Sequence, residues 1–450
     1  MMLQTPLHFQ KKILAATFAT LFLSACNSGS NDKAVQEAVK VIEPVIDNSD
    51  HSEHHSKGRL AIAEKDQTLI RFIDLDDHSL LEEISTTHPA GYLYATPSGR
   101  YLTAVQRNQH LVEFIDGGLS QVAHGDHFDT VEEAPSLLSY QLDVTKPTHY
   151  NTIDQQAALY SDGDKTAGIS SGFYLFDEKS IEAGTYTASH TMDTSMHGTM
   201  QVRGNYVLST IVQDLTGQNE KYNMPDHVAL FELHDDHFHQ EQIFEVSCPG
   251  LHGSFQGENW TVFGCSDGVL AIEQVGATFS AKKISHDIGI GTLKGSNHLD
   301  KFLGLTRSRQ AFIIDPVLGK ITEIDWKASP DVSMLAYTTD AHQEHFIVLD
   351  SEGYLNLFSI ENNYTLEQRF MVLDIAAPVA SEAKAAPATI KHKIVASGSQ
   401  EQVFITNPAD NTILEVDLVA MKVTNTLQLD FTPNIIAWLG IKEQDADHAH

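Results

Sequence analysis

The chain has 450 residues, of which 42% are hydrophobic, so it can bury a substantial core as one large repeat fold or as several domains. Its 60 acidic residues outnumber 29 Lys and Arg, which gives a formal net charge of −31. Because phosphate groups are bound by clustered positive charge, this balance argues against nucleic acid and anionic lipid as partners. It is compatible with attraction of cations, and equally with a soluble acidic surface. The unusual count is 24 histidines against 3 cysteines.

Residues 1–26 have the features of a bacterial lipoprotein signal. Lys11 and Lys12 form a basic segment, and the apolar stretch ILAATFATLF after them is too short to span a bilayer comfortably. LSAC then ends at Cys26 and resembles a lipobox, so we predict that Cys26 is lipidated. The alternatives are an ordinary signal peptide with a spare cysteine, or an uncleaved anchor. The predicted location is the periplasm, with a lipid anchor in the membrane.

Residues 27–57 are polar and predict a flexible tether. Its motif HSEHHS contains His51, His54 and His55. In an exposed, flexible segment this cluster could capture a metal ion weakly and hand it on; the alternative is a solvated linker. At the other end of the chain, residues 441–450 predict a disordered tail.

From Gly58 onward, short β-rich runs follow one another, separated by Gly, Asp, Asn and Pro, with almost no helical periodicity. The runs group into cycles of four, and the third run of several cycles ends in Asp (FID, LFD, IIDP). The final run, NIIAWLG, has no partner after it and is expected to pair with the first runs, RLAIAE, TLIRFID and LLEEIS.

These runs predict an all-β fold, a β-propeller over residues 58–440 whose ring is closed by the C-terminal strand. The count favours eight four-stranded blades. Seven is the alternative, because residues 376–393 are the least regular; there the run TIKHKI is expected to open the last complete cycle.

Two cysteines remain beyond the signal segment. Cys248 and Cys265 lie seventeen residues apart and flank one predicted strand. In an oxidising compartment outside the cytoplasm the expected arrangement is a disulfide. The alternative, a zinc dithiolate, would require both thiols to stay reduced.

Three histidines occupy nearly the same local setting. PTHYNTI, SMHGTMQ and GLHGSFQ place His149, His197 and His252 just before short strands, at spacings of 48 and 55 residues. Each interval is about one four-stranded repeat, and the first strand of every propeller blade lines the central channel. A single histidine at a strand start is usually a hydrogen-bonded core or turn residue. Three in register favour a zinc site on the axis. In the next cycle Lys294 replaces histidine and is expected to line the channel.

A fourth ligand could come from a long insertion, residues 117–135, in the second blade. Its motif HGDHFD contains His124, Asp126 and His127. Imidazole and carboxylate groups in this mixture favour zinc over calcium or magnesium, and leave copper and nickel open. Because ligation requires neutral imidazole, affinity should fall as pH drops through the histidine range. A second motif, HDDHFH at residues 234–239, predicts a solvent-facing turn where we expect no specific site.

Several motifs resemble those of the AztD family of periplasmic zinc metallochaperones. They are KPTHYNTID, CPGLHGSF, FGCSDGVL and IGTLKG, in an exported propeller with an early HGDHFD loop. The resemblance covers most of residues 58–440 and is most specific over 248–295. It implies a protein that binds Zn²⁺ through the channel histidines and the loop, and passes it to the solute-binding protein of a zinc ABC importer. The lipobox departs from this pattern, since a freely diffusing carrier would be expected.

Motifs of common enzyme classes are missing. The sequence has no Gly-rich phosphate loop, G-x-S-x-G elbow or H-E-x-x-H motif. We therefore expect a zinc carrier and not an enzyme. Two alternatives stay open: a metal-dependent propeller enzyme, which would keep an open coordination position, and a protein-docking module in which the histidines are incidental.

Overall fold

The structure is a computed structural model that describes residues 56–124, 127–216, 223–375 and 390–442. The predicted lipidation at Cys26, the tether cluster His51, His54 and His55, and most of the predicted tail lie outside the described residues. Within the described part, no helix is both long and apolar enough to cross a membrane.

Strands make up nearly all of the regular structure. The two helices of the described residues are short, η1 (Arg107–Gln109) and α1 (Glu178–Glu182). The first strands are β1 (Arg59–Glu64), β2 (Leu69–Asp74), β3 (Leu80–Ser85), β4 (Tyr92–Ala95), β5 (Tyr101–Gln106), β6 (Leu111–Asp116), β7 (Leu119–His124), β8 (His127–Glu132), β9 (Ser136–Asp143), β10 (Pro147–Ile153), β11 (Gln156–Ser161), β12 (Gly172–Phe176), β13 (Ala188–Thr191), β14 (Met200–Arg203), β15 (Tyr206–Ile211), β16 (His227–His234) and β17 (His237–Phe244).

The second half continues in the same way. Its strands are β18 (Ser254–Gln256), β19 (Trp260–Cys265), β20 (Gly268–Val275), β21 (Thr278–Ser285), β22 (Thr292–Gly295), β23 (Phe302–Leu305), β24 (Ala311–Asp315), β25 (Lys320–Ile324), β26 (Met334–Thr339), β27 (His345–Asp350), β28 (Tyr354–Ser359), β29 (Thr365–Met371), β30 (Ile394–Ala396), β31 (Gln402–Asn407), β32 (Thr412–Asp417), β33 (Lys422–Gln428) and β34 (Pro433–Leu439).

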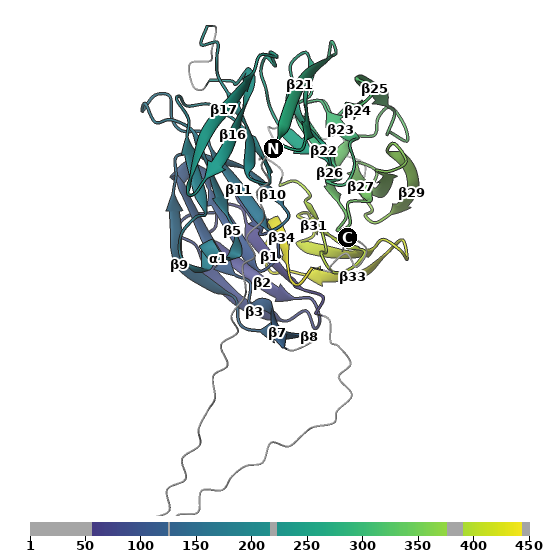
Figure 1. Ribbon diagram of the computed structural model, residues 1–450. Coiled ribbons are helices and arrows are strands. Elements are labelled where there is room, and N and C mark those ends of the chain that lie inside the picture. The colour runs from purple at the N-terminus through teal and green to yellow at the C-terminus, as the bar shows by residue number, and fades with distance from the viewer. Residues whose placement is uncertain (1–55, 125–126, 217–222, 376–389, 443–450) are drawn as a thin grey trace, which may run out of the picture. The chain divides into compact units, whose positions relative to one another are not determined.

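Consecutive strands pair into antiparallel sheets that follow one another around a centre (Figure 1). The pairing orders are β3-β2-β1-β34, β4-β5-β6-β9, β10-β11-β12-β13-β17-β16-β15-β14, β18-β19-β20-β21, β22-β23-β24-β25, β26-β27-β28-β29, β30-β31-β32-β33 and the hairpin β7-β8. This succession of four-stranded units is a β-propeller, as predicted.

The C-terminal strand closes the ring. β34 pairs antiparallel with β1, from Arg59 opposite Leu439 to Ala63 opposite Ile435. The first sheet therefore contains strands from both ends of the described chain, and β34 also contacts β4 of the next sheet. The predicted closure is confirmed, and it removes a sheet edge that would otherwise be free to pair.

The blade number stays a prediction. Strands β10–β13 and β14–β17 are joined into one sheet through a single parallel pair, Ser189 with His237. The predicted strand TIKHKI is wrong in its position, since β30 begins only at Ile394. Just before it, Lys393 bonds the hydroxyl of Thr406, and the His392 ring contacts the carbonyl of the same residue. The N–H of Thr406 still donates to the carbonyl of Lys393, so the Thr406 hydroxyl replaces only one of the two backbone bonds of a regular pair there.

The aspartates that end successive strands have a common structural role. The carboxylate of each accepts a hydrogen bond from a backbone N–H two or three residues further on and so begins a turn. The distances are 2.7 Å at Asp74, 2.9 Å at Asp116, 2.7 Å at Asp177, 2.8 Å at Asp315 and 2.7 Å at Asp417. The recurring Asp therefore reflects turn chemistry, and at Asp177 it caps α1.

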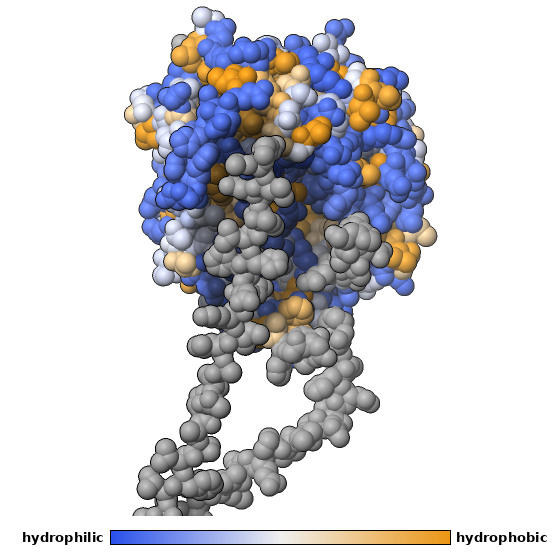
Figure 2. Space-filling view, viewed as in Figure 1, coloured by the Kyte–Doolittle hydropathy of each residue, from blue (hydrophilic) through white to orange (hydrophobic). Residues whose placement is uncertain are grey.

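The core lies between the faces of neighbouring sheets. The second strands, such as β19, are buried along their whole length, whereas outer strands such as β33 alternate between exposed and half-buried or buried residues. Phe173 of β12 packs against Phe231 and Phe238, with ring centroids 5.7 and 5.1 Å apart. Burying one such side chain contributes roughly 1.5–3 kcal/mol. The visible outer surface is mostly hydrophilic, in keeping with the net charge (Figure 2).

Candidate metal centre

The three channel histidines come from three successive first-strand positions. His149 lies in β10, where the register shifts between Pro147 and Tyr150. His197 lies between β13 and β14, and His252 between β17 and β18. Each precedes or opens the first strand of a four-stranded unit, as their spacing predicted.

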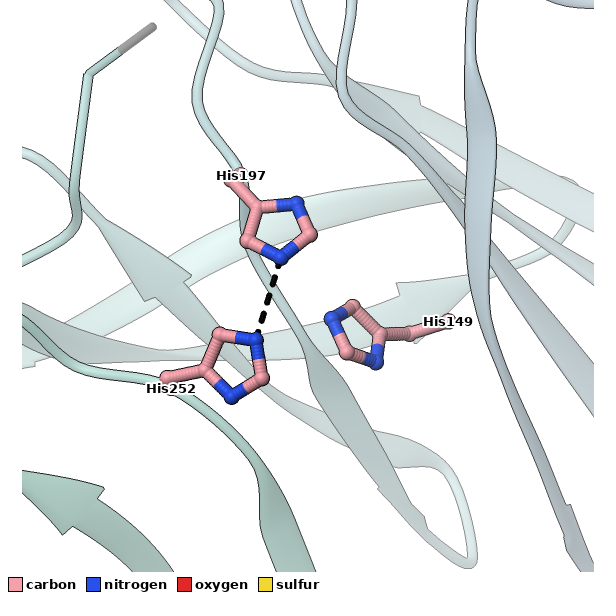
Figure 3. A group of neighbouring side chains, drawn as sticks. All are labelled: His149, His197 and His252. Atoms are coloured by element: carbon pink, nitrogen blue, oxygen red, sulfur yellow. Dashed lines mark hydrogen bonds between the residues drawn. The ribbon is translucent and has the colours of Figure 1, made fainter. Parts of the chain in front are cut away.

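The three imidazoles face one another (Figure 3). Their ring centroids are 5.1 Å apart for His149–His197, 5.5 Å for His149–His252 and 5.1 Å for His197–His252. One nitrogen of each ring lies within 4.8 Å of a nitrogen of both others, which is close enough to hold one metal ion. Sequence spacing therefore located three side chains that the fold brings together.

The segments that carry His197 and His252 are held by backbone hydrogen bonds. The His197 N–H donates to the carbonyl of Asn223, and the His252 N–H to that of Gly264 (3.1 and 2.9 Å). Gly253 has φ +74°, and a Cβ there would lie 2.7 Å from the carbonyl oxygen of Gly291, so only glycine fits. His252 is thus delivered by a turn with little freedom.

A disulfide fixes the start of the same segment. Cys248 and Cys265 are bonded, with their Cα atoms 4.9 Å apart, so the predicted disulfide is confirmed and the zinc dithiolate is ruled out. The bond ties the chain just before His252 to the end of β19. Both cysteines are buried beside Leu251 in one core cluster. The covalent link and the core together restrict the position of His252.

His197 is oriented by a buried carboxylate. Its Nδ1 lies 2.8 Å from Oδ2 of Asp162, which also accepts a bond from Arg107 at 2.7 Å. Burial by itself would raise the pKa of Asp162, but the bonds and charges of His197 and Arg107 outweigh it and hold that pKa below its usual value. The carboxylate is therefore ionised and accepts the Nδ1 proton of His197.

His252 is oriented by the backbone. Its Nδ1 lies 2.8 Å from the carbonyl oxygen of Gly291, which can only accept a hydrogen bond. The Nδ1 atoms of His197 and His252 thus each face an acceptor, and their Nε2 atoms face each other. These two Nε2 atoms are 3.2 Å apart. At this distance they share a hydrogen bond in the absence of an ion, and a metal ion bound to both Nε2 lone pairs would replace it (Figure 3).

His149 is held neutral. Burial, followed by the neighbouring His197 and His252, lowers its pKa from 6.5 to about 3. Among the described residues no hydrogen bond engages its ring, so its contacts are the rings of the other two histidines. A neutral imidazole with an uncommitted nitrogen is the form that binds a metal ion.

One side of the group opens on a polar cavity of about 320 Å³. The cavity is lined by Arg107, Lys146, Asp162, Gly163, Lys165, Ser195 and His197. A neighbouring cavity of about 450 Å³ shares Lys165 and Ser195 with it. All three histidines are partly exposed, and His197, whose side chain is 22% exposed, is the one that lines this cavity.

The predicted loop ligands are placed differently. His124 and His127 pair at the end of the hairpin β7–β8, which is inserted between the third and fourth strands of its sheet. In an antiparallel unit that connection lies at the opposite end from the connections that carry His197 and His252. Their side chains and Asp126 lie outside the described residues. A role for them at the same ion stays a prediction, one that the strand topology does not favour.

Lys294 belongs to a separate cavity. It lies in β22 and, with Lys442 and Trp438, lines a space of about 400 Å³. Burial lowers the pKa of Lys442. This cavity shares no lining residue with the one beside His197.

Sequence reasoning missed the residues that orient the histidines. Asp162 stands 35 positions before His197, in a turn after β11, and Gly291 contributes only a backbone oxygen. Nothing in the spacing of either points to an imidazole. Only the packing of neighbouring sheets against one another brings these two residues to the histidines.

Fold and site together define a β-propeller in which three imidazoles converge, one of which, His149, is held neutral by burial. No family model matches the chain. The chain is similar to the zinc chaperone AztD of Citrobacter koseri, with 23% identity over 407 residues that cover 87% of this chain and 88% of that protein. The resemblance to AztD expected from the motifs is thereby confirmed.

Solved structures agree on the fold. A structure of apo AztD from Citrobacter koseri superposes with a TM-score of 0.67 at 21% identity, covering 86% of this chain and 98% of the other. A second AztD crystal structure from Citrobacter koseri gives 0.68 at 21% identity, covering 86% and 99%. The dihydro-heme d1 dehydrogenase NirN gives 0.53 at 10% identity, covering 84% and 75%. Since an enzyme also has this fold, the fold alone does not decide function.

Proposed function

We propose that this protein is a zinc metallochaperone that holds Zn²⁺ through His149, His197 and His252. The observation that carries the proposal is the approach of two Nε2 atoms to 3.2 Å when both Nδ1 atoms are committed to acceptors. A divalent cation bound to both Nε2 lone pairs replaces the hydrogen bond between these atoms with two metal–nitrogen bonds. The neutral ring of His149 supplies the third ligand.

Zinc suits the spacing of these nitrogens. With Zn–N bonds of about 2.0–2.1 Å, two ligands of a tetrahedral ion lie roughly 3.3 Å apart. The separation of the His197 and His252 Nε2 atoms, 3.2 Å, is close to that value. Contacts from Asp162 and Gly291 to the outer nitrogens are the kind that orient zinc-bound imidazoles and raise their basicity. The likeness to a protein named zinc chaperone adds independent support for this cargo.

The same geometry suits release of the ion. Three protein nitrogens leave a fourth position of a tetrahedral ion for an incoming ligand. The cavity beside His197 gives that ligand a path, and His197 is partly exposed. Transfer then proceeds by exchange, in which a histidine of the acceptor binds the ion before His197 lets go. The protein in this proposal is a carrier and not an enzyme, in line with the relative, which is named a chaperone.

The acceptor in this proposal is the solute-binding protein of a zinc ABC importer, and the compartment is the periplasm. Both rest on the motif resemblance to AztD and on the signal-like residues 1–26. A lipid on Cys26 would keep the carrier at the membrane, and His51, His54 and His55 would collect zinc weakly for the central site. The acidic chain, at −31, favours a cation as cargo over an anion.

A transfer assay tests the function. The zinc-loaded chain is mixed with the apo acceptor, and the appearance of the zinc-bound acceptor is followed against a chelator that reports spontaneous dissociation. The expected result is transfer faster than dissociation, with a rate that rises with acceptor concentration. Equal rates with acceptor and chelator would contradict a chaperone role. Retention of zinc by a His149→Ala, His197→Ala, His252→Ala variant would contradict the site.

A further inference from the structure

A second group of histidines lies on the hairpin of β16 and β17, at the upper left of Figure 1. The two strands pair antiparallel, with Glu232 opposite His239 and His234 opposite His237. Paired residues share a face of a hairpin, and so do residues two apart on one strand. Register therefore places all four of these side chains on one face.

The other face of the hairpin belongs to the core. Phe231 and Phe238 are 1% and 6% exposed and pack in the cluster that also contains Phe173. This burial fixes the register, because a slip by one residue would turn the histidines inward and the aromatic residues outward. The polar face is consequently held on a rigid support.

A register shift adds a fifth side chain to this face. It falls where Leu230 pairs with Gln242 but Phe231 with Gln240, so Glu241 has no pairing partner on β16. Its Oε1 lies 4.0 Å from Nε2 of His234, and Oε2 of Glu232 lies 3.6 Å from the same nitrogen. Ligand atoms of Glu232, His234 and Glu241 all lie within 4.8 Å of one another.

The two histidines of β17 continue the group. The Nε2 atoms of His237 and His239 are 3.0 Å apart, and the rings of His234 and His239 have centroids 4.8 Å apart. Nδ1 of His237 lies 3.2 Å from a carboxylate oxygen of Asp236, which favours a proton on Nδ1 and a lone pair on Nε2. Imidazole nitrogens therefore converge here as well, one of them on a ring whose other nitrogen faces a carboxylate.

We propose that this hairpin is a second binding site for a divalent transition-metal ion of the zinc class. Its ligands are His234, Glu232 and Glu241, whose ligand atoms lie within 4.8 Å of one another, and His239 and His237 lie beside them. Mixed imidazole and carboxylate donors suit zinc, copper and nickel better than calcium or magnesium. The site was not expected from HDDHFH, since a turn motif does not reveal that strand register gathers residues from both sides of it.

This site differs from the central one in exposure. The side chains of His234 and His237 are 49% and 57% exposed. Ligands in water hold an ion more weakly and exchange it faster than buried ones, because solvent competes for the metal and screens the carboxylates. The inference does not depend on the chaperone role, since it concerns binding alone.

The test uses full-length mature chain without a histidine tag, carrying His149→Ala, His197→Ala and His252→Ala to silence the central site. Zinc chloride is titrated calorimetrically into this background, into the same background with His234→Gln and His239→Gln, and into a matched control with His88→Gln. His88 is exposed and belongs to no group of neighbouring ligands among the described residues. Circular dichroism checks that each variant is folded.

The expected result is a binding event, in the background and in the His88→Gln control, that the hairpin substitutions weaken at least about tenfold. Weak binding to His51, His54 and His55 should be the same in all three proteins. With Cu²⁺ as a second probe, electron paramagnetic resonance should show nitrogen coupling that the hairpin substitutions remove. Identical titrations and spectra for the hairpin variant and the control would overturn the proposal, whatever the central site does.

Discussion

Besides the hairpin of β16 and β17, two regions among the described residues each bring three potential metal ligands within 4.8 Å of one another, yet only one of these two is suited to bind an ion. The first is the central group of His149, His197 and His252. The second is formed by Asp340, Glu344 and His345 at the turn between β26 and β27. The number of potential ligands is the same in both regions. Their protonation states and hydrogen bonds distinguish the two.

In the second region the carboxylate is already committed. Asp340 is buried and accepts bonds from the backbone N–H groups of Glu344 and His345 (2.8 and 3.1 Å) and from Nδ1 of His345 (2.8 Å). These bonds to Asp340, with Glu367 also contributing, raise the pKa of His345 from 6.5 to about 9. His345 is therefore a cation that stabilises a turn, while His149, with its pKa near 3, is a neutral ligand.

The largest expected effect comes from the central histidines. Replacing His252 or His197 with Ala removes one of three protein ligands and should weaken zinc binding at least about 100-fold. His345→Gln, the matched change in the other region, should leave zinc affinity unchanged. Competition titration with a zinc-chelating dye measures both. Equal losses at His252 and His345 would break the distinction between the regions.

A smaller effect is expected from the carboxylates. Asp162→Asn keeps the shape of the side chain but removes the charge that orients His197, so zinc affinity should fall about 10–100-fold. Asp340→Asn should lower the free energy of unfolding and leave zinc affinity as it is. Dye competition and urea denaturation, run on both variants, check the pair. A zinc defect in the Asp340 variant alone would reverse our assignment of the two sites.

The pH dependence of stability should show opposite slopes for the two histidines. His345 has a folded pKa of about 9, above its unfolded value of about 6.5, so its contribution is full below pH ~6.5 and is lost as pH rises through about 9. The loss should be about 1–2 kcal/mol in the apo protein. His345→Gln should flatten that alkaline slope in urea denaturation from pH 6 to 9.5. An unchanged slope would show that another group causes it.

His149 should affect the stability of the apo protein at acidic pH. Its folded pKa of about 3 lies below the unfolded value of about 6.5. The contribution of neutral His149 to the stability of the apo protein is therefore full above pH ~6.5 and is lost as pH drops toward 3. His149→Gln should reduce the loss between pH 6.5 and 4. The expected weakening of zinc binding through the histidine range therefore does not arise from protonation of His149 in the apo site. A steeper acid loss in the variant would count against a neutral His149.

The sequence was informative where residue types recur at a regular spacing, either along a strand or from one four-stranded repeat to the next. Alternating runs and terminal aspartates predicted the strands and their turns, and repeat-length spacing predicted that His149, His197 and His252 converge. It was uninformative where contacts cross between sheets. Asp162 and Gly291 reach the imidazoles only through the packing of one unit on the next. The hairpin cluster depends on a register that the burial of Phe231 and Phe238 sets. The strand before Ile394 was misplaced because the side chain of Thr406 replaces a ladder bond there.

The most direct test of the account is a crystal structure of the zinc-loaded mature chain, with anomalous diffraction recorded on both sides of the zinc absorption edge. The account predicts a strong peak bonded to Nε2 of His197, Nε2 of His252 and a ring nitrogen of His149, and none at Asp340, Glu344 and His345. A fully loaded protein with no peak between the three histidines would contradict it.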